Sequence, residues 1–325
     1  MNKLKIGTVV LVALCAAVMP VLSGTQASAQ SKFPSRPINF MIPYPPGGWF
    51  DAVSRPMCDY SSKALRQPVV PVNKPGGSGT LVLSLVKATA PDGYNVAVGT
   101  SSLFSLPPQQ DMNFDAAKDF TYISRTVDSP LGIAVKADSP WKTLKDLVAY
   151  ARANPGKIKY GTASPRGSLG FNMIIIGKKE GIQWEMVPFA GGQLVVNALL
   201  GGHIQAIMQG SEWIPHVDAG TLRLLAIAGE KRWKRFPNVP CTGELGYDST
   251  TAPVMMVGPA GMPQEIVKLL DTTFKASLQD PGTIKVMEQF ALQNAYMDHG
   301  QVTAWAMKQI DFYKKFIKEI GVAKP

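Results

Sequence analysis

Short apolar segments alternate with amphipathic ones along the chain, and glycine-rich loops lie between them. Apolar stretches of strand length cover residues 38–42, 69–73 and 95–99, and helical periodicity covers 52–65 and 80–89 between them. Strands and helices that alternate over short loops are typical of a mostly parallel sheet with helices on both faces. Ligands of such sheets bind beyond the carboxyl ends of the strands, so these loops are candidate binding elements.

A second block of the same kind follows an extended apolar stretch at 121–136. It contains predicted helices at 144–153, 171–179 and 193–200 and predicted strands at 157–162, 184–188, 204–208 and 222–228. The pattern is completed by a late strand at 254–258, a helix at 263–278 and an amphipathic helix at 301–320.

We interpret the chain as two α/β lobes, each a mostly parallel sheet flanked by helices, with the second lobe inserted into the first. Lobe I comprises residues 30–126 and 250–325, and lobe II comprises residues 127–249. The extended stretches at 121–136 and 247–259 are the two predicted crossover strands.

The N-terminal residues have the pattern of a secretory signal. Lys3 and Lys5 precede an apolar run at 6–22, and residues 27–29 match an A-x-A cleavage site. A membrane anchor needs a longer apolar run than this one, without interruption. We therefore expect residues 1–29 to be a cleaved signal peptide and the mature chain to be exported.

The charge balance is basic. The formal net charge is +10, and it falls to +8 without residues 1–29, which hold Lys3 and Lys5 but no acid. Export argues against nucleic acid as a partner, so solubility or the attraction of small anions explains the excess better. The segment 231–236 places two aromatic residues among four basic ones, a composition that stacks on bases. We interpret it as a solvated surface turn, with a docking face for a membrane partner as the alternative.

Two cysteines, Cys58 and Cys241, remain after processing. Export permits a disulfide between them, and two buried free thiols explain the sequence equally well.

The sequence has no complete catalytic motif. No Gly-x-Ser-x-Gly elbow occurs, the three histidines form no metal-binding pair, and the glycine loops match neither the P-loop nor the dinucleotide fingerprint. We therefore expect binding without turnover, with no catalytic residue, metal or cofactor. A secreted hydrolase that uses Ser168 or Ser78 is a remote alternative, because no base or acid accompanies either serine.

The loop after the first predicted strand has the features of an anion-binding turn. Pro45 and Pro46 stiffen it, Gly47 and Gly48 permit positive φ or close backbone approach, and Asp51 is a candidate cap for the helix from residue 52. A strand, a glycine turn and a helix start present free backbone N–H groups and the positive end of a helix dipole at one place.

These loops together resemble the Bug-type periplasmic solute-binding receptors of tripartite tricarboxylate transporters. The family's motifs match, in order, residues 33–38, 43–48 with Asp51, 67–70, 73–79, 91–94, 118–120, 153–157, 187–192 and 258–263. The similarity covers essentially the whole mature chain. Each motif is weak alone, but the ordered set is specific.

The resemblance implies a two-lobed type II periplasmic binding protein fold that closes on a carboxylate-bearing solute in the interlobe cleft. Backbone amides, hydroxyls and ordered waters hold the carboxylate in that family. The resemblance also implies a periplasmic monomer that meets membrane transporter subunits transiently. A ligand-loaded co-receptor for a membrane sensor is the alternative function. The expected ligand-binding residues are Tyr44, Gly47, Gly48, Trp49, Phe50, Asp51, Ser101, Ser102, Arg166, Ser168, Phe189, Gly191, Gly192 and Gln209.

Three departures from the family pattern bear on the ligand. Trp49 and Phe50 stand where small or polar residues are usual, and two rings beside an anion site favour a flat aromatic carboxylate. Arg166 lies in a loop that usually carries small polar residues, where its guanidinium is a candidate partner for a carboxylate. Residues 208–210 lack the Asp found in relatives that bind amino-group ligands, which argues against an amino acid.

Overall fold

Two mixed β-sheets organise residues 33–324, the part of the chain that the computed structural model describes. The predicted signal peptide, residues 1–29, lies outside the described residues. None of the helices within residues 33–324 combines the length and the apolar character needed to cross a bilayer.

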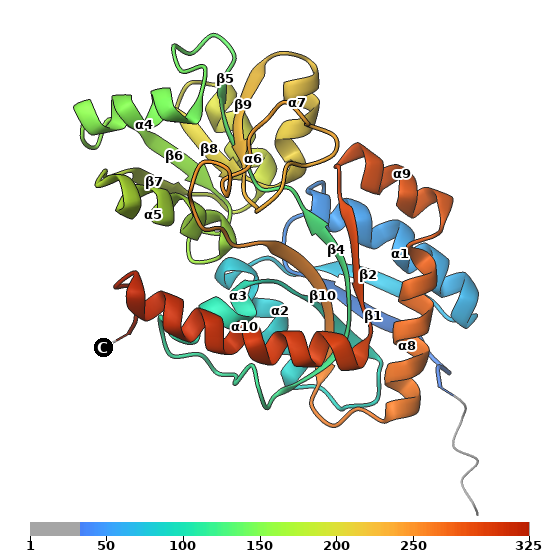
Figure 1. Cartoon of the computed structure of the whole chain (residues 1–325). Coiled ribbons are helices and arrows are strands. Elements are labelled where there is room, and N and C mark those ends of the chain that lie inside the picture. The colour runs from blue at the N-terminus through green and yellow to red at the C-terminus, as the bar shows by residue number, and fades with distance from the viewer. Residues whose placement is uncertain (1–32, 325) are drawn as a thin grey trace, which may run out of the picture. The chain divides into compact units, whose positions relative to one another are not determined.

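The first sheet has six strands in the order β11-β4-β10-β3-β1-β2 (Figure 1). Its strands are β1 (Ile38–Ile42), β2 (Val69–Asn73), β3 (Asn95–Gly99), β4 (Phe120–Ser129), β10 (Ala252–Pro259) and β11 (Gln293–Met297). β1 pairs in parallel with β2 and β3, whereas β10 pairs antiparallel with β3 and β4.

Helices cover both faces of this sheet because side chains alternate along its strands. Ile38, Phe40 and Ile42 of β1 belong to the core cluster that contains residues of α1 and α8. Met41, which points the other way, belongs to the cluster with residues of α2, α3 and α10. The helices and turns of this half are α1 (Trp49–Leu65), η1 (Gly77–Gly79), α2 (Leu81–Lys87), α3 (Ser102–Ser105), α8 (Gln264–Ser277), α9 (Pro281–Gln289) and α10 (His299–Glu319).

The second sheet has five strands in the order β7-β6-β8-β5-β9. Its strands are β5 (Gly132–Lys136), β6 (Lys159–Thr162), β7 (Glu185–Pro188), β8 (Ala206–Gln209) and β9 (Leu222–Ile227). β6 is parallel to β7 and β8, and β5 is antiparallel to β8 and β9. The helices here are α4 (Leu144–Ala153), α5 (Ser168–Glu180), α6 (Gly192–Leu200), η2 (Ser211–Trp213) and α7 (Ile214–Asp218).

The chain changes sheets twice, between β4 and β5 and between β9 and β10. The two passages lie together, because Ser129 at the end of β4 pairs with Ala252 at the start of β10. The predicted fold class, two lobes that each hold a sheet flanked by helices, is confirmed. The expectation that each sheet is mostly parallel is wrong, because β10 in the first sheet and β5 in the second run antiparallel to both of their neighbours. The lobe boundaries 30–126, 127–249 and 250–325 remain a prediction.

Helix α1 begins three residues earlier than predicted. Its N-cap is Gly48, and Asp51 lies in the first helical turn instead of capping the helix. From there the Asp51 carboxylate reaches back and accepts a hydrogen bond from the Gly47 backbone N–H at 3.1 Å. The helix also continues through Pro56, although a proline inside a helix removes one backbone hydrogen bond. Burial of Val53 and Met57 on either side helps to offset the lost backbone hydrogen bond.

The sequence pattern missed α9 and β11. α9 buries only Thr283 among its residues, so it has little of the apolar periodicity that predicts a helix. β11 contains no fully buried residue and becomes a strand by pairing at the sheet edge with β4.

The two cysteines of the described chain are free and buried. Cys58 lies on α1 in the core of the first sheet, and burial raises the pKa of its thiol. The backbone of Cys241 forms an isolated β-bridge with Ile227, at the end of β9 in the second sheet. The structure therefore favours free thiols over the disulfide.

We predict that the native mature protein carries two unpaired thiols. A thiol reagent will react slowly with the folded protein, because both groups are buried, and will label two groups per chain in denaturant without reductant. A mass two units below that of the reduced chain, with no labelling, would show a disulfide instead.

We also predict that Thr143→Ala lowers the free energy of unfolding by about 1 kcal/mol. Thr143 Oγ1 accepts from the Asp146 N–H at 3.2 Å, and the Asp146 carboxylate accepts from the Thr143 N–H at 2.9 Å. This capping box satisfies two backbone donors at the start of α4. Urea denaturation measures the change. Lys145→Ala, an exposed change in the first turn that leaves both hydrogen bonds of the capping box in place, is the control and should have almost no effect.

Candidate functional site

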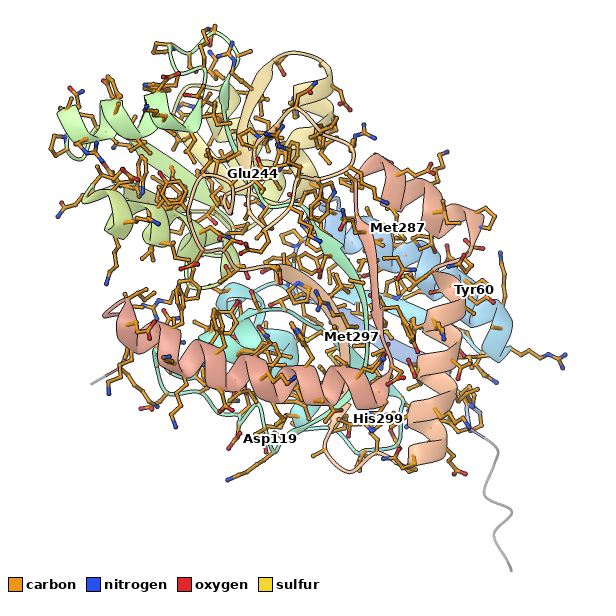
Figure 2. All side chains as sticks on the ribbon, in the orientation of Figure 1. Tyr60, Asp119, Glu244, Met287, Met297 and His299 are labelled. Atoms are coloured by element: carbon orange, nitrogen blue, oxygen red, sulfur yellow. The ribbon has the colours of Figure 1, made fainter. Side chains whose placement is uncertain are left out.

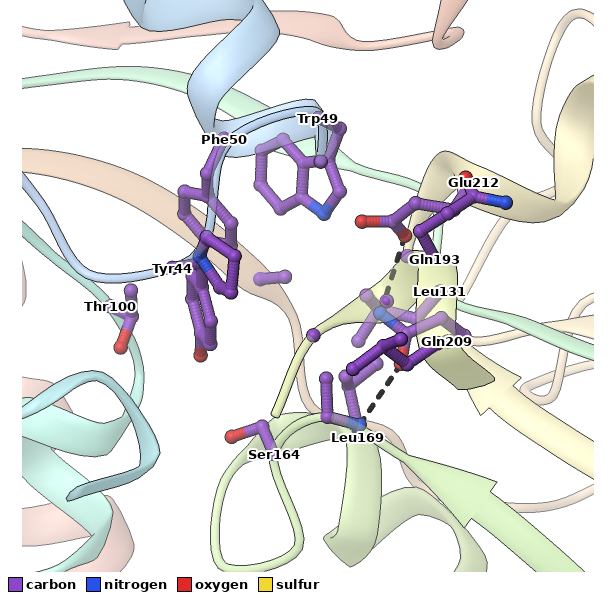
Figure 3. Close-up of a pocket in the computed structure, with 18 of the residues that line it drawn as sticks. Tyr44, Trp49, Phe50, Thr100, Leu131, Ser164, Leu169, Gln193, Gln209 and Glu212 are labelled. Atoms are coloured by element: carbon purple, nitrogen blue, oxygen red, sulfur yellow. Dashed lines mark hydrogen bonds between the residues drawn. The ribbon is translucent and has the colours of Figure 1, made fainter. Parts of the chain in front are cut away.

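A cavity of about 260 Å³ lies where loops follow the strands of both sheets (Figure 3). Five segments line it, and each comes directly after a strand: β1, β3, β6, β7 and β8. Leu131, between β4 and β5, and Ala252, at the start of β10, complete the lining at the two passages between the sheets. This location matches the general rule for ligand sites of α/β sheets.

One wall of the cavity is aromatic. The rings of Trp49 and Phe50 stack with centroids 3.7 Å apart, and Tyr44 lies 4.8 Å from Phe50. Trp49 is 2% exposed, so these rings belong to the core of the first sheet and also face the cavity (Figure 3). A flat apolar group can bury its surface against such a wall.

Hydroxyl groups gather at one end of the cavity. Ser164 and Thr100 face the Tyr44 phenol. Burial raises the pKa of this phenol to about 12, so it is neutral at physiological pH. The backbone N–H of Ser168, the first residue of α5, donates to Ser101 Oγ at 3.3 Å. Neutral hydroxyls beside the start of a 13-residue helix can hydrogen-bond a carboxylate.

Gln209 and Glu212 form a second polar group. The Ala163 backbone N–H donates to Gln209 Oε1 at 3.1 Å, which turns the amide nitrogen Nε2 toward Glu212 Oε2 at 3.2 Å. Glu212 is 6% exposed. Burial raises the pKa of its carboxyl, and hydrogen bonds from its own backbone, Gln209 and the Trp49 backbone oppose that rise.

Sequence reasoning missed Glu212. The absence of Asp at residues 208–210 argued against an amino-acid ligand, but the structure places another acid, Glu212, in the cavity. η2 turns the chain directly after β8, so an acid three residues beyond Gln209 returns to the cavity. A lone glutamate before an apolar segment gives no motif, so no pattern in the sequence identified it.

The cavity brings together nine of the residues predicted to bind ligand. They are Tyr44, Gly48, Trp49, Phe50, Ser101, Ser168, Gly191, Gly192 and Gln209. Further lining residues that sequence reasoning did not select include Pro45, Pro46, Thr100, Ala163, Ser164, Leu169, Gln193, Leu194, Gly210 and Glu212.

Five predicted residues do not line the cavity. Arg166 is exposed, and its guanidinium donates to the Gln110 side chain, away from the cavity. Phe189 packs into the core of the second sheet. Ser102 is fully buried, and its hydroxyl has no hydrogen-bond partner among the described residues. Gly47 and Asp51 hydrogen-bond to each other within the loop that follows β1.

Asp51 holds the loop after β1 in place. Its carboxylate accepts from the Gly47 N–H, from two nitrogens of Arg55 at 2.8 and 2.9 Å, and from Asn73 Nδ2 at 3.0 Å. Asn73 also donates to the Tyr44 backbone carbonyl at 2.9 Å. Burial raises the pKa of Asp51, but the hydrogen bonds from Arg55, Gly47 and Asn73 outweigh it and keep the pKa below its usual value. Asp51 is therefore a positioning residue for the turn.

Other candidate sites have structural explanations. The Ser168 hydroxyl donates to the Thr251 backbone carbonyl, which occupies its proton. No group of three or more His, Cys, Asp and Glu residues within 33–324 is arranged to hold a metal ion.

The basic and aromatic segment 231–236 packs as a surface turn. Arg232 pairs with Glu244 at 2.8 Å, and Arg235 pairs with Asp218 at 2.7 Å (Glu244 is labelled in Figure 2). Trp233 and Phe236 pack against the core of the second sheet instead of presenting free faces. These contacts support the interpretation as a surface turn.

We predict that Asp51→Ala destabilises the protein most near neutral pH. The carboxyl has a lower pKa in the folded chain than its value of about 3.9 when unfolded, so its stabilisation is present above that value. The stabilisation disappears as the pH falls through the folded pKa, and the difference between the variant and the wild type should shrink below about pH 4. Urea denaturation from pH 3 to 7 measures this difference. Asp59→Ala, an exposed change on the same helix, should show little difference at any pH.

The comparisons with known proteins agree with this architecture. The model of the tripartite tricarboxylate transporter family receptors matches residues 53–322. A relative from Cupriavidus necator, "UPF0065 protein in gbd 5'region", is 38% identical over 305 residues, which cover 93% of this chain and 93% of the relative.

Two solved structures are similar over nearly their whole length. One, described as a periplasmic transporter, has a TM-score of 0.84 and 26% identity and covers 90% of this chain and 99% of its own. The other, an R. palustris protein with adipate, has a TM-score of 0.83 and 25% identity, with coverage of 90% and 99%. Since the family model spans most of the sequence, this chain belongs to the receptors of the tripartite tricarboxylate transporter family, and it is a substrate-binding protein and not an enzyme.

Proposed function

We propose that this protein is a periplasmic receptor that captures an organic carboxylate between its two lobes and delivers it to the membrane subunits of a tripartite tricarboxylate-type transporter. The observation that best supports this proposal is the composition of the cavity. An apolar aromatic wall stands beside hydroxyls and a helix start, and both sheets contribute to it. The family membership and the similar protein solved with adipate support a carboxylate as the ligand.

The carboxylate binds at the hydroxyl end in this proposal. Thr100, Ser101 and Ser164 supply donors there, and the start of α5 at Ser168 adds the positive end of its dipole. Closure of the lobes removes water and strengthens each hydrogen bond. Rotation about the β4–β5 and β9–β10 passages makes the loaded, closed form the one that the membrane partner recognises.

The aromatic wall favours an aromatic carboxylate as ligand. The rings of Trp49, Phe50 and Tyr44 form one side of the cavity. Leu131 and Leu169 are apolar residues on the other side (Figure 3). Burial of a benzoate-sized ring there removes more apolar surface from water than burial of a short aliphatic chain. Calorimetry with a set of aromatic and aliphatic carboxylates tests the proposal. Binding of none of them would overturn the proposed function, and binding of aliphatic acids only would overturn the aromatic preference.

We predict that Trp49→Ala weakens benzoate binding by about tenfold or more, since it removes a large part of the wall. Binding of a short aliphatic acid such as butyrate should change little. Trp49→Phe, which keeps a ring at this position, should recover most of the loss. Phe312→Ala removes an exposed ring outside the cavity and is the control. Equal losses for both ligands in Trp49→Ala would count against ring stacking.

A further inference from the structure

The carboxyl of Glu212 lies between the glycine turns that begin α1 and α6. A Cβ added to Gly48 would be 3.3 Å from Glu212 Oε1, and one added to Gly192 would be 2.4 Å from the same atom. Gly48 is the N-cap of the 17-residue helix α1, and Gly192 is the first residue of the nine-residue helix α6. A side chain at Gly192 would therefore collide with the carboxyl, and one at Gly48 would crowd it.

The groups around Glu212 are those that hold a bound anion. Gln209 Nε2 donates to Oε2 at 3.2 Å, and the Trp49 backbone N–H also hydrogen-bonds to the carboxyl. Two helix starts add positive dipole ends at the same place. The side chain of Glu212 therefore occupies the position that an anionic group of a ligand would otherwise take.

No cationic residue lines the cavity within the described chain, and Glu212 is its one acidic lining residue. The other titratable group that faces Glu212 is the neutral Tyr44 phenol. Asp51 on α1 is engaged by Arg55. A second ligand carboxylate would compete with Glu212 for the same donors, and in its ionised form the side chain would also repel it at short range in a water-poor site. A ligand ammonium would face two positive helix ends.

We propose that Glu212 is a built-in carboxyl group that restricts this receptor to ligands with a single carboxylate. The ligand's carboxylate binds at the hydroxyl end, near Ser101 and Ser164, and its uncharged end lies against Glu212. This inference rests on the proposed function, because it assigns the class of carboxylate to the same cavity.

Two pairs of ligands with matched shapes test the proposal by calorimetry on the mature protein at neutral pH. The pairs are adipamate with adipate, and 4-carbamoylbenzoate with terephthalate. In each pair an amide replaces one carboxylate with little change in size. We expect the wild type to bind the better-fitting monocarboxylate at least about tenfold more tightly than its dicarboxylate partner.

Substitution of Glu212 should reverse this preference. In Glu212→Gln the dicarboxylate should gain about tenfold relative to its monoamide, because the substitution removes the ionisable carboxyl while the shape remains. Glu212→Ala, which frees the donors altogether, should show the same direction. Glu265→Gln removes one exposed charge outside the cavity and should leave the ratio unchanged. The wild-type ratio tests the proposal even where a variant folds poorly.

Three results would overturn the inference. One is equal binding of both members of each pair by the wild type, with no change of ratio in Glu212→Gln; the proposed function would then stand. The second is tighter binding of an amino acid than of its deaminated analogue, lost in Glu212→Gln, which would show that Glu212 pairs with an ammonium. The third is the absence of binding by every carboxylate to wild type and variants, which would overturn the proposed function as well.

Discussion

Backbone donors at the starts of three helices meet at one cavity, and the arrangement of the chain around it depends on this convergence. α1, α5 and α6 each begin directly after a strand and a glycine-containing turn, and the first residues of all three line the cavity. Unpaired N–H groups at a helix start need an acceptor. At α5 they lie beside neutral hydroxyls, whereas at α1 and α6 the carboxyl of Glu212 lies next to them.

The two ends of the cavity therefore differ in their polar groups although they are built in the same way. Hydroxyl groups at the α5 end carry no charge and can donate to the carboxylate of the proposed ligand. At the α1 and α6 end, the carboxyl of Glu212 already accepts hydrogen bonds from the Trp49 backbone and from Gln209. The aromatic wall between them contributes apolar surface and is itself held from behind, because Trp49 and Phe50 are part of the first core. The side chains of Trp49 and Phe50 thus stabilise the core and also line the cavity.

The loop after β1 illustrates how a residue outside the cavity determines its form. Asp51 joins Gly47, Arg55 and Asn73, and Asn73 holds the backbone of Tyr44. None of Gly47, Asp51 and Asn73 lines the cavity. Their hydrogen bonds nevertheless place the phenol of Tyr44 and the ring of Phe50 next to one another.

The sequence by itself determined the order of strands and helices, because apolar periodicity and glycine or proline loops are local properties. β1, β2, β3 and α4 were predicted with their observed bounds, and the glycine turns at Gly48 and Gly191, predicted to be binding loops, both line the cavity. Only the tertiary structure decided which side chains face the cavity. Arg166 turned outward to Gln110, and Glu212 turned inward beside Gln209. Both outcomes depend on contacts between residues distant in the chain, such as Gly48 with Glu212, and no local pattern encodes such contacts.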